Sequence, residues 1–312
     1  MAGRTGRRRT RVCAGYVAWL WVVALSFVFP CGAASAGEIG HYVEGIEGLK
    51  CGSLPPPGLY FRQYNVFYSA DTFKDAHGNK LKLGFDLDVF ASAQRAIWIT
   101  NTNILGANYG MDVIVPLQDT NLEFHSLGLD DNHGGLGDLA FEPLLLAWHG
   151  KQWDLSLGWA FYAPTGNFVK SDLVNPGEDF WTYMFTYGGT YYLDKEKTWS
   201  ASILGRYEIH SPHADQDIRT GDDAHFEYGF GKELGKGFGA GVVGYCHWQV
   251  TDDKGKEAVN PNVHDRVFAI GPEITYSDLK HMLFLSVRHE WEMGARDRPE
   301  GQITVFTLTK RF

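Results

Sequence analysis

Apolar side chains alternate with small or polar ones, with a period of two, along most of the chain from Gly58 to Phe312. In the clearest stretch, 153–161, the odd positions hold Trp, Leu, Leu, Trp and Phe, and the even positions hold Asp, Ser, Gly and Ala. Successive side chains of a β-strand point to opposite faces, so this period predicts strands with one apolar and one polar face. Helical periodicity is scarce. The sequence therefore predicts an all-β fold.

About twelve segments of this kind can be counted. The predicted strands are 58–69, 84–101, 107–118, 135–148, 152–163, 179–193, 198–210, 224–234, 238–250, 264–277, 281–293 and 302–312. The connections alternate between short and long, and the long ones are 70–83, 119–134, 164–178, 211–223, 251–263 and 294–301. Tight turns at one end and long loops at the other are typical of outer-membrane barrels.

Two architectures compete for this pattern. A soluble sandwich or propeller also alternates, but its loops need not sort by length into two ends. Strands of roughly 10–14 residues fit a tilted membrane crossing better than the typical strand of a soluble sheet. The 37 Gly, 20 Phe, 15 Tyr and 10 Trp fit turns and interfacial aromatic girdles. We therefore expect a transmembrane antiparallel up-and-down β-barrel of about twelve strands, with both chain ends on the periplasmic side.

Residues 1–36 have the order of a secretory signal peptide. Five arginines come first, an apolar run extends from Val12 to Phe29, and Ala34-Ser35-Ala36 provides an A-x-A cleavage site. We expect cleavage before Gly37; an uncleaved anchor helix is the alternative. Because the segment carries no acid, its removal leaves 23 basic and 37 acidic residues, a formal charge of −14.

This acidic balance argues against a nucleic-acid partner. The mature chain keeps Cys51 and Cys246 in an oxidising compartment, and a disulfide and two separate thiols both remain open. The last strand ends on Phe312, with Phe306, Leu308 and Lys310 on the same face. A terminal aromatic residue resembles the signal read by the barrel-assembly machinery, although Lys310 replaces the usual apolar residue.

More specific motifs surround the first strand and recur later in the chain. These are Gly45-Ile46-Glu47-Gly48-Leu49-Lys50-Cys51-Gly52-Ser53-Leu54-Pro55-Pro56-Pro57-Gly58, Tyr60-Phe61-Arg62-Gln63-Tyr64-Asn65, Gly135-Leu136-Gly137-Asp138 and Tyr162-Ala163-Pro164-Thr165-Gly166. With the Phe312 terminus they resemble the family labelled MetA-pathway of phenol degradation, over nearly the whole mature chain. The resemblance implies an outer-membrane barrel similar to the fatty-acid and toluene channels, without fixing a substrate.

The segment 37–57 precedes the first strand. In the channels that the resemblance suggests, such a segment plugs the lumen, so it is a candidate gate with Pro55, Pro56 and Pro57. The other interpretation is a stiff lead-in that fixes where the first strand begins, and both stay open. Three consecutive prolines favour an extended conformation in either case.

The faces expected to point inward are polar. They carry Asp86, Asp88, Gln94, Asp138, Glu142, Asp154, Arg206, Glu208, His210, Glu227, His247, Arg288, Glu290 and Glu292. Paired charges that satisfy one another are the simplest interpretation. The functional hypothesis is a ligand path in which Arg206 and Arg288 orient a phenolate or carboxylate beside Tyr245, with His247 and Asp138.

The sequence contains little that supports an enzymatic activity or a bound cofactor. An outer-membrane phospholipase needs a Ser and a His side by side on the outer face, whereas His210-Ser211 and His125-Ser126 are sequence neighbours that point to opposite faces. No C-x-x-C or H-E-x-x-H motif or phosphate-binding loop occurs, and 130–133 is better read as a solvated loop. We expect no enzyme, no cofactor and no metal site.

The sequence thus predicts three parts: signal peptide 1–36, lead-in or plug 37–57, and barrel 58–312. The expected function is passive uptake of small hydrophobic or aromatic, phenol-like compounds across the bacterial outer membrane. The expected partners are membrane lipid, such a ligand and the assembly machinery. A structural or surface-binding barrel is the main alternative, and a lipid hydrolase is the third.

Overall fold

The computed structural model describes residues 40–312, so the signal peptide and its cleavage site lie outside the described residues. The strands are β1 (Gly58–Ala70), β2 (Phe85–Ile104), β3 (Ala107–Phe124), β4 (Leu129–Leu136), β5 (Leu139–His149), β6 (Trp153–Ala163), β7 (Thr182–Tyr192), β8 (Trp199–His210), β9 (Asp223–Gly235), β10 (Phe238–Gln249), β11 (Arg266–Asp278), β12 (Leu283–Arg296) and β13 (Gln302–Arg311). Within this range no helix is long and apolar enough to cross a membrane.

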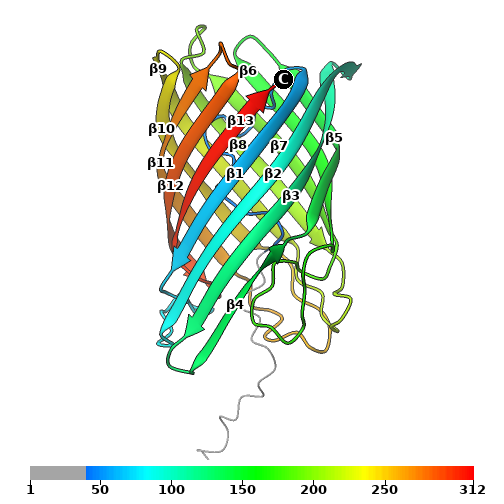
Figure 1. Cartoon of the computed structure of the whole chain (residues 1–312), viewed down its shortest axis with the longest axis vertical. Helices are drawn as coiled ribbons and strands as arrows, with labels where there is room; N and C mark the ends of the chain where they lie inside the picture. Colours follow the sequence, from blue (N-terminus) through cyan, green and yellow to red (C-terminus); the bar gives the residue numbers. More distant parts are fainter. Residues whose placement is uncertain (1–39) are drawn as a thin grey trace, which may run out of the picture. The chain divides into compact units, whose positions relative to one another are not determined.

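Twelve of these strands close into an antiparallel barrel, which confirms the predicted fold class (Figure 1). Each strand pairs with the next along the chain, except that β3 pairs with both β4 and β5. β1 closes the barrel by pairing with β13, from Tyr60 opposite Arg311 to Ser69 opposite Gln302. Closure leaves no unpaired sheet edge in the membrane, where an unsatisfied backbone group would cost several kcal/mol.

The alternation sorts side chains between lipid and lumen as the sequence predicts. In β6, Trp153, Leu155 and Leu157 are exposed on the outer face, whereas Asp154 and Ser156 are buried inside. Apolar side chains of the outer face contact lipid tails and polar ones avoid them, which is why the period of two persists through the membrane.

The stretch 119–134, expected to be a loop, is mostly strand. β3 continues to Phe124 and turns back into β4, with pairs from Leu117 opposite Leu136 to Phe124 opposite Leu129. This hairpin extends beyond the rest of the barrel at the long-loop end (Figure 1). In water neither face needs to be apolar, so its Asp, Asn, Gly and His residues gave no strand signal.

The expectation that Asp86, Asp88 and Gln94 face the lumen is also wrong, because β2 points its odd-numbered residues, such as Arg95 and Ile97, inward. The neighbours of the two aspartates, Phe85 and Leu87, point inward and pack in an apolar cluster with Leu122, while both aspartates are exposed. This part of β2 pairs with the extended end of β3. Beyond the lipid the polarity of the two faces inverts, because the outer face meets water.

Residues 40–57, named the lumen segment here, run through the barrel interior before β1 begins (Figure 1). His41 Nε2 lies 2.8 Å from Asp138 Oδ2 at the long-loop end. The Ser53 hydroxyl donates to Asp154 Oδ2 at 2.8 Å, close to the short turn that begins β6. The first described residue therefore lies at the end opposite Phe312, although the barrel strands themselves begin and end on one side as predicted.

Candidate functional site

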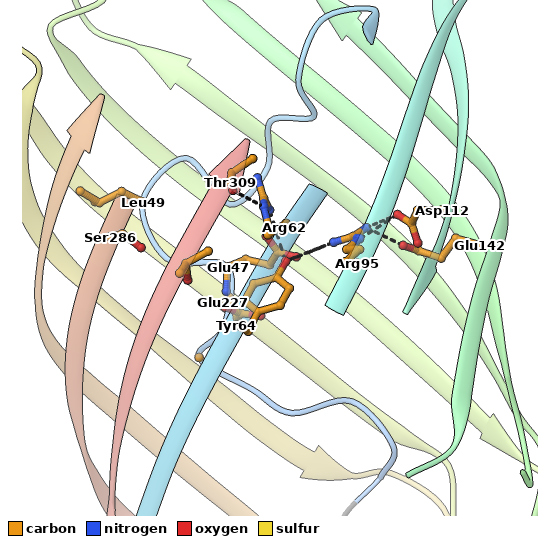
Figure 2. Close-up of polar contacts among 12 residues, drawn as sticks. Glu47, Leu49, Arg62, Tyr64, Arg95, Asp112, Glu142, Glu227, Ser286 and Thr309 are labelled. Atoms are coloured by element: carbon orange, nitrogen blue, oxygen red, sulfur yellow. Dashed lines mark hydrogen bonds and ion pairs between the residues drawn. The ribbon is translucent and has the colours of Figure 1, made fainter. Parts of the chain in front are cut away.

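Glu47, near the middle of the lumen segment, binds two wall arginines (Figure 2). Its Oε1 accepts hydrogen bonds from Arg95 Nη1 at 2.9 Å and from the Tyr64 hydroxyl at 3.0 Å. Its Oε2 accepts from Arg62 Nη1 at 2.9 Å. A third guanidinium, Arg206, stands 3.7 Å away. A carboxylate so surrounded holds the segment by charge-assisted hydrogen bonds from β1 and β2.

Arg95 is itself locked in place by the neighbouring strands. Its Nε and Nη2 donate to Asp112 Oδ2 on β3 at 2.8 and 2.5 Å, and its Nη2 donates to Glu142 Oε2 on β5 at 2.6 Å (Figure 2). The Arg95 side chain is 7% exposed, so its charge needs these partners. A buried guanidinium without acceptors would carry a large desolvation penalty.

A second contact with the segment forms on β8 and β9. Glu227 accepts hydrogen bonds from the Glu47 amide at 2.9 Å, from Arg206 Nη1 at 3.2 Å and from the Tyr42 hydroxyl. The Arg206 guanidinium also lies 3.7 Å from the centre of the Tyr42 ring. This stacking is a cation–π contact, which is strengthened by burial.

A third contact comes from β11 and β12. Glu273 Oε2 accepts a hydrogen bond from the Leu49 amide at 2.5 Å, and Arg288 Nη1 donates to the Gly45 carbonyl at 3.1 Å. Arg288 Nη2 lies 3.3 Å from Glu273 Oε1. An acidic and a basic residue on neighbouring strands thus bind a backbone amide and a backbone carbonyl of the segment.

Asp138 fixes the segment at the long-loop end. Besides His41, it accepts hydrogen bonds from the amides of Gly166 at 2.7 Å and Glu178 at 2.8 Å. Burial acts to raise the pKa of Asp138, but the hydrogen bonds from His41 and from the two amides outweigh it and hold the pKa below its usual value. Asp138 therefore joins two long-loop residues to the start of the described chain.

Glycines on the inner wall provide the space for the segment. A Cβ atom at Gly229 would stand 3.1 Å from the Gly48 carbonyl oxygen and from Leu49 Cα, and one at Gly231 would stand 2.7 Å from Leu49 Cδ2. Conversely, a Cβ at Gly52 would come within 2.4 Å of the Gly189 backbone. The wall and the segment are thus fitted to each other at backbone distance.

Beside the segment lies a residual cavity whose lining includes Glu47, Arg62 and Arg206. Its lining shares Leu157, Gly158 and Thr186 with an apolar groove on the outer face of the barrel. Residue 158 is glycine, and the residue opposite it on β7 is the small, buried Thr186. The cavity and the lipid-facing groove therefore lie on the two faces of the same short stretch of β6 and β7.

The residues proposed as a ligand path all reach the lumen, but they are engaged. Arg206 and Arg288 bind Glu227 and Glu273 as well as the segment, which is the arrangement expected of paired interior charges. The Tyr245 hydroxyl donates to Glu292 Oε1 at 2.7 Å. His247 lies between Glu44 and Asp265. While the segment is in place, these groups present no free binding surface.

The prolines and the terminal residue lie at the short-turn end. The Pro56 carbonyl accepts a hydrogen bond from the Tyr60 hydroxyl at 2.7 Å, and the Pro57 carbonyl accepts from Arg311 Nη2 at 2.8 Å. The Phe312 amide donates to the Leu59 carbonyl at 2.9 Å, and its ring is exposed. Its recognition by the assembly machinery stays a prediction.

Cys51 and Cys246, the two cysteines within residues 40–312, are free. Cys51 is buried in the lumen segment, whereas Cys246 follows the inward Tyr245 on β10 and points outward, so the barrel wall separates them. The Ser–His neighbours also diverge: His210 lies 2.7 Å from Thr182 Oγ1, while the Ser211 oxygen accepts from the Trp181 amide.

Sequence reasoning missed the residues that hold the segment from both sides. Arg62 and Arg95 occupy inward positions on β1 and β2. Glu44 and Glu47 lie outside any strand, so strand periodicity could not predict where their side chains point. One signal was available. The barrel strands carry arginines at inward positions and the lead-in carries acids. These opposite charges are what a segment bound inside the barrel requires.

The comparisons with known proteins agree with this architecture. The model of the family described as MetA-pathway of phenol degradation matches residues 70–308. The COG4313 outer membrane channel from Pseudomonas putida F1 superposes with a TM-score of 0.73 at 14% identity, over 88% of this chain and 99% of that one. A search of curated protein sequences gave no significant match.

Two more distant barrels share the general shape. The β domain of the Bordetella autotransporter BrkA has a TM-score of 0.49 at 10% identity, over 83% of this chain and 100% of that one. The CymD monoaromatic hydrocarbon channel has 0.44 at 8% identity, over 83% and 89%. Because the family match spans most of the sequence and the fold is a closed twelve-stranded barrel, the chain belongs to the MetA-pathway of phenol degradation family and is an outer-membrane β-barrel.

Proposed function

We propose that the barrel mediates passive uptake of small hydrophobic or aromatic, phenol-like compounds, and that the lumen segment is its gate. The observation that carries this proposal is the glycine-lined track around Gly48, Leu49 and Gly52. The interior is filled by a separate length of backbone rather than by wall side chains alone. Displacing that backbone would leave an opening.

The attachments of the segment suit a gate. They are hydrogen bonds and ion pairs, with no disulfide, since Cys51 is free. In a buried ion pair the Coulomb attraction is largely offset by the desolvation of both charges, so such contacts fix a position more than they add stability. Family membership supports the proposal, and so does the structural likeness to the outer membrane channel of Pseudomonas putida.

An emptied lumen would expose the guanidinium groups that now bind the segment. Arg62, Arg95, Arg206 and Arg288 would then line the path beside the ring of Tyr245. A phenolate or carboxylate is the ligand that such a combination of charges and rings favours. The acids that pair with these arginines, Glu142 and Glu273 among them, would partly neutralise the positive charge of the path.

A sideways exit into the membrane is the second part of the proposed path. The residual cavity and the outer groove share Leu157, Gly158 and Thr186, and the groove is lined further by Trp159 and Phe185. If β6 and β7 separate locally, an apolar molecule in this part of the lumen would contact the aromatic side chains of the outer groove and pass into the lipid.

Deletion of residues 40–54 tests the gate. We expect the truncated barrel to conduct ions in planar bilayers at a level well above the intact protein, and cells that carry it to take up radiolabelled phenol faster. The matched control is Val43→Ala, a change at an exposed position of the segment that leaves its anchors intact.

A structural or surface-binding barrel is favoured by one observation, the packed and salt-bridged lumen. That alternative predicts equal uptake with and without the gene across a panel of phenols and alkanes. It also predicts no conductance from the truncated barrel. This pair of results would exclude transport.

A further inference from the structure

A compact cluster of histidines and acids lies in the lumen toward the long-loop end. It is formed by Glu44, Glu208, His210, Asp223, His225, His247 and Asp265, all of them buried. Six come from β8, β9, β10 and the residue before β11, and Glu44 comes from the lumen segment. None of the contacts in the Glu47 region involves these seven side chains.

Within the cluster, three atoms converge on one point. Glu44 Oε1 lies 2.6 Å from His247 Nδ1, within ion-pair distance, and 3.5 Å from His225 Nδ1. Both ring nitrogens of the buried His225 form no hydrogen bond among residues 40–312. A buried polar atom left without a hydrogen bond costs about 1–3 kcal/mol, so an imidazole with neither nitrogen bonded needs an explanation.

A metal ion would satisfy all three atoms at once. Two imidazole nitrogens and one carboxylate oxygen form a common set of protein ligands for Zn²⁺. Ligand atoms of a tetrahedral zinc site with bonds of about 2.1 Å stand about 3.4 Å apart. The separation of Glu44 Oε1 and His225 Nδ1 already has this value, and that of Glu44 and His247 needs to widen by less than 1 Å.

The far side of the cluster supplies the supporting contacts that metal-bound histidines usually have. His247 Nε2 lies 3.1 Å from Asp265 Oδ1, and Arg298 Nη1 donates to the other oxygen of this carboxylate, Oδ2, at 3.0 Å. His225 Nε2 faces Glu208 Oε2 at 3.5 Å. A carboxylate on the second ring nitrogen fixes the tautomer and leaves the first nitrogen free to bind a metal.

The local charge also favours a cation. Arg298 pairs with Asp265, but Glu44, Glu208 and Asp223 have no arginine or lysine within ion-pair distance in the described chain. We propose that Glu44, His225 and His247 bind a divalent first-row transition metal of the zinc type. Because Glu44 belongs to the lumen segment and both histidines to the wall, the ion ties the segment to β9 and β10.

Sequence motifs could not indicate this site, because its ligands are 181 and 22 residues apart, counted from 44 to 225 and from 225 to 247. Only the strand register places His225 opposite His247. Metal binding by the purified protein does not depend on whether the barrel transports a ligand.

The test uses the mature protein, folded in detergent after removal of metals with EDTA. Zn²⁺ is added either to the folded barrel or during refolding, so that a closed lumen does not block access. After gel filtration, bound zinc is measured by mass spectrometry and the melting temperature by intrinsic fluorescence. We expect close to one equivalent of Zn²⁺ and a higher melting temperature with zinc than without it.

Three variants decide the assignment. Glu44→Gln and His225→Gln should each lower the zinc affinity at least tenfold. His289→Gln should leave it unchanged, since His289 points outward from β12 and contacts Thr304. Glu44→Gln keeps the size of the side chain and leaves the wall sequence unchanged, and heat-modifiable gel mobility checks that the variant has folded. Absence of stoichiometric zinc in the wild type, or equal binding in wild type and Glu44→Gln, would overturn the proposal.

Discussion

Glu47 Oε1 accepts a hydrogen bond from Arg95 Nη1 at 2.9 Å, and this contact joins the lumen segment to strand β2 across 48 positions of sequence. The same guanidinium binds Asp112 and Glu142, so one wall arginine links three strands and the segment. Because all four side chains are buried, the position of the segment and the packing of the wall depend on each other.

Replacing the acid at this contact should open the barrel. Glu47→Gln removes the only carboxylate that Arg62 binds in the described chain and one of the three that Arg95 binds, and breaking a buried ion pair costs about 3–5 kcal/mol. We expect the open population to rise at least a hundredfold, since each 1.4 kcal/mol is tenfold. The open population is measured as the conductance of the barrel in planar bilayers. Glu196→Gln, at an exposed turn, is the control and should conduct like the wild type.

A side chain at Gly52 should expel the segment without touching the wall sequence. A Cβ there would come within 2.4 Å of the Gly189 backbone, a distance that no small shift accommodates. We expect Gly52→Val to keep the heat-modifiable gel mobility of a folded barrel while a protease added from outside cleaves the segment. If Gly52→Val were as resistant to cleavage as Val43→Ala, the track would not hold the segment.

A reversible cross-link can be introduced with one substitution. Cys51 Sγ lies 3.4 Å from Ser202 Oγ, so Ser202→Cys places two sulfur atoms close to disulfide range. Oxidation should then suppress phenol uptake, and reduction should restore it. Ser200→Cys, two residues away on the same face of β8, should show no redox dependence. Uptake that continues through the oxidised Ser202→Cys barrel would contradict a gating segment.

Asp138 should contribute stability that disappears in acid. Its pKa is lower in the folded protein than the unfolded value of about 3.9, so the ionised carboxylate stabilises the fold above that pH. The contribution falls as the pH drops through the lower, folded pKa. Asp138→Asn should therefore melt below the wild type at pH 7, with a loss of about 1–3 kcal/mol, and the difference should shrink near pH 3. A difference independent of pH would point to packing instead of charge.

The strand pattern could be predicted from the sequence because each strand faces lipid on one side, independently of the other strands. The alternation in 153–161 reports an environment that every residue meets on its own, apolar on one side and polar on the other. The same reasoning failed at Asp86 and in the hairpin of β3 and β4, where the chain has left the membrane and that contrast no longer exists.

The candidate site was only partly accessible. The sequence placed Arg206, Arg288 and Tyr245 on inward faces, because parity along a strand is local information. It did not indicate that Glu47 and Glu273 form ion pairs with these arginines. No local sequence pattern specifies which residues of different segments lie at the same depth in the barrel.

By itself, then, the sequence determined an outer-membrane barrel, the approximate course of its strands and, on most strands other than β2, which side chains point inward. The tertiary structure alone decided what fills the interior. Strand tilt and register, accumulated around a closed wall, bring His225 beside His247 and set Gly229 against Gly48. The course of residues 40–57 through the lumen follows from these long-range contacts, because a segment without periodicity takes its conformation from the surface that it meets.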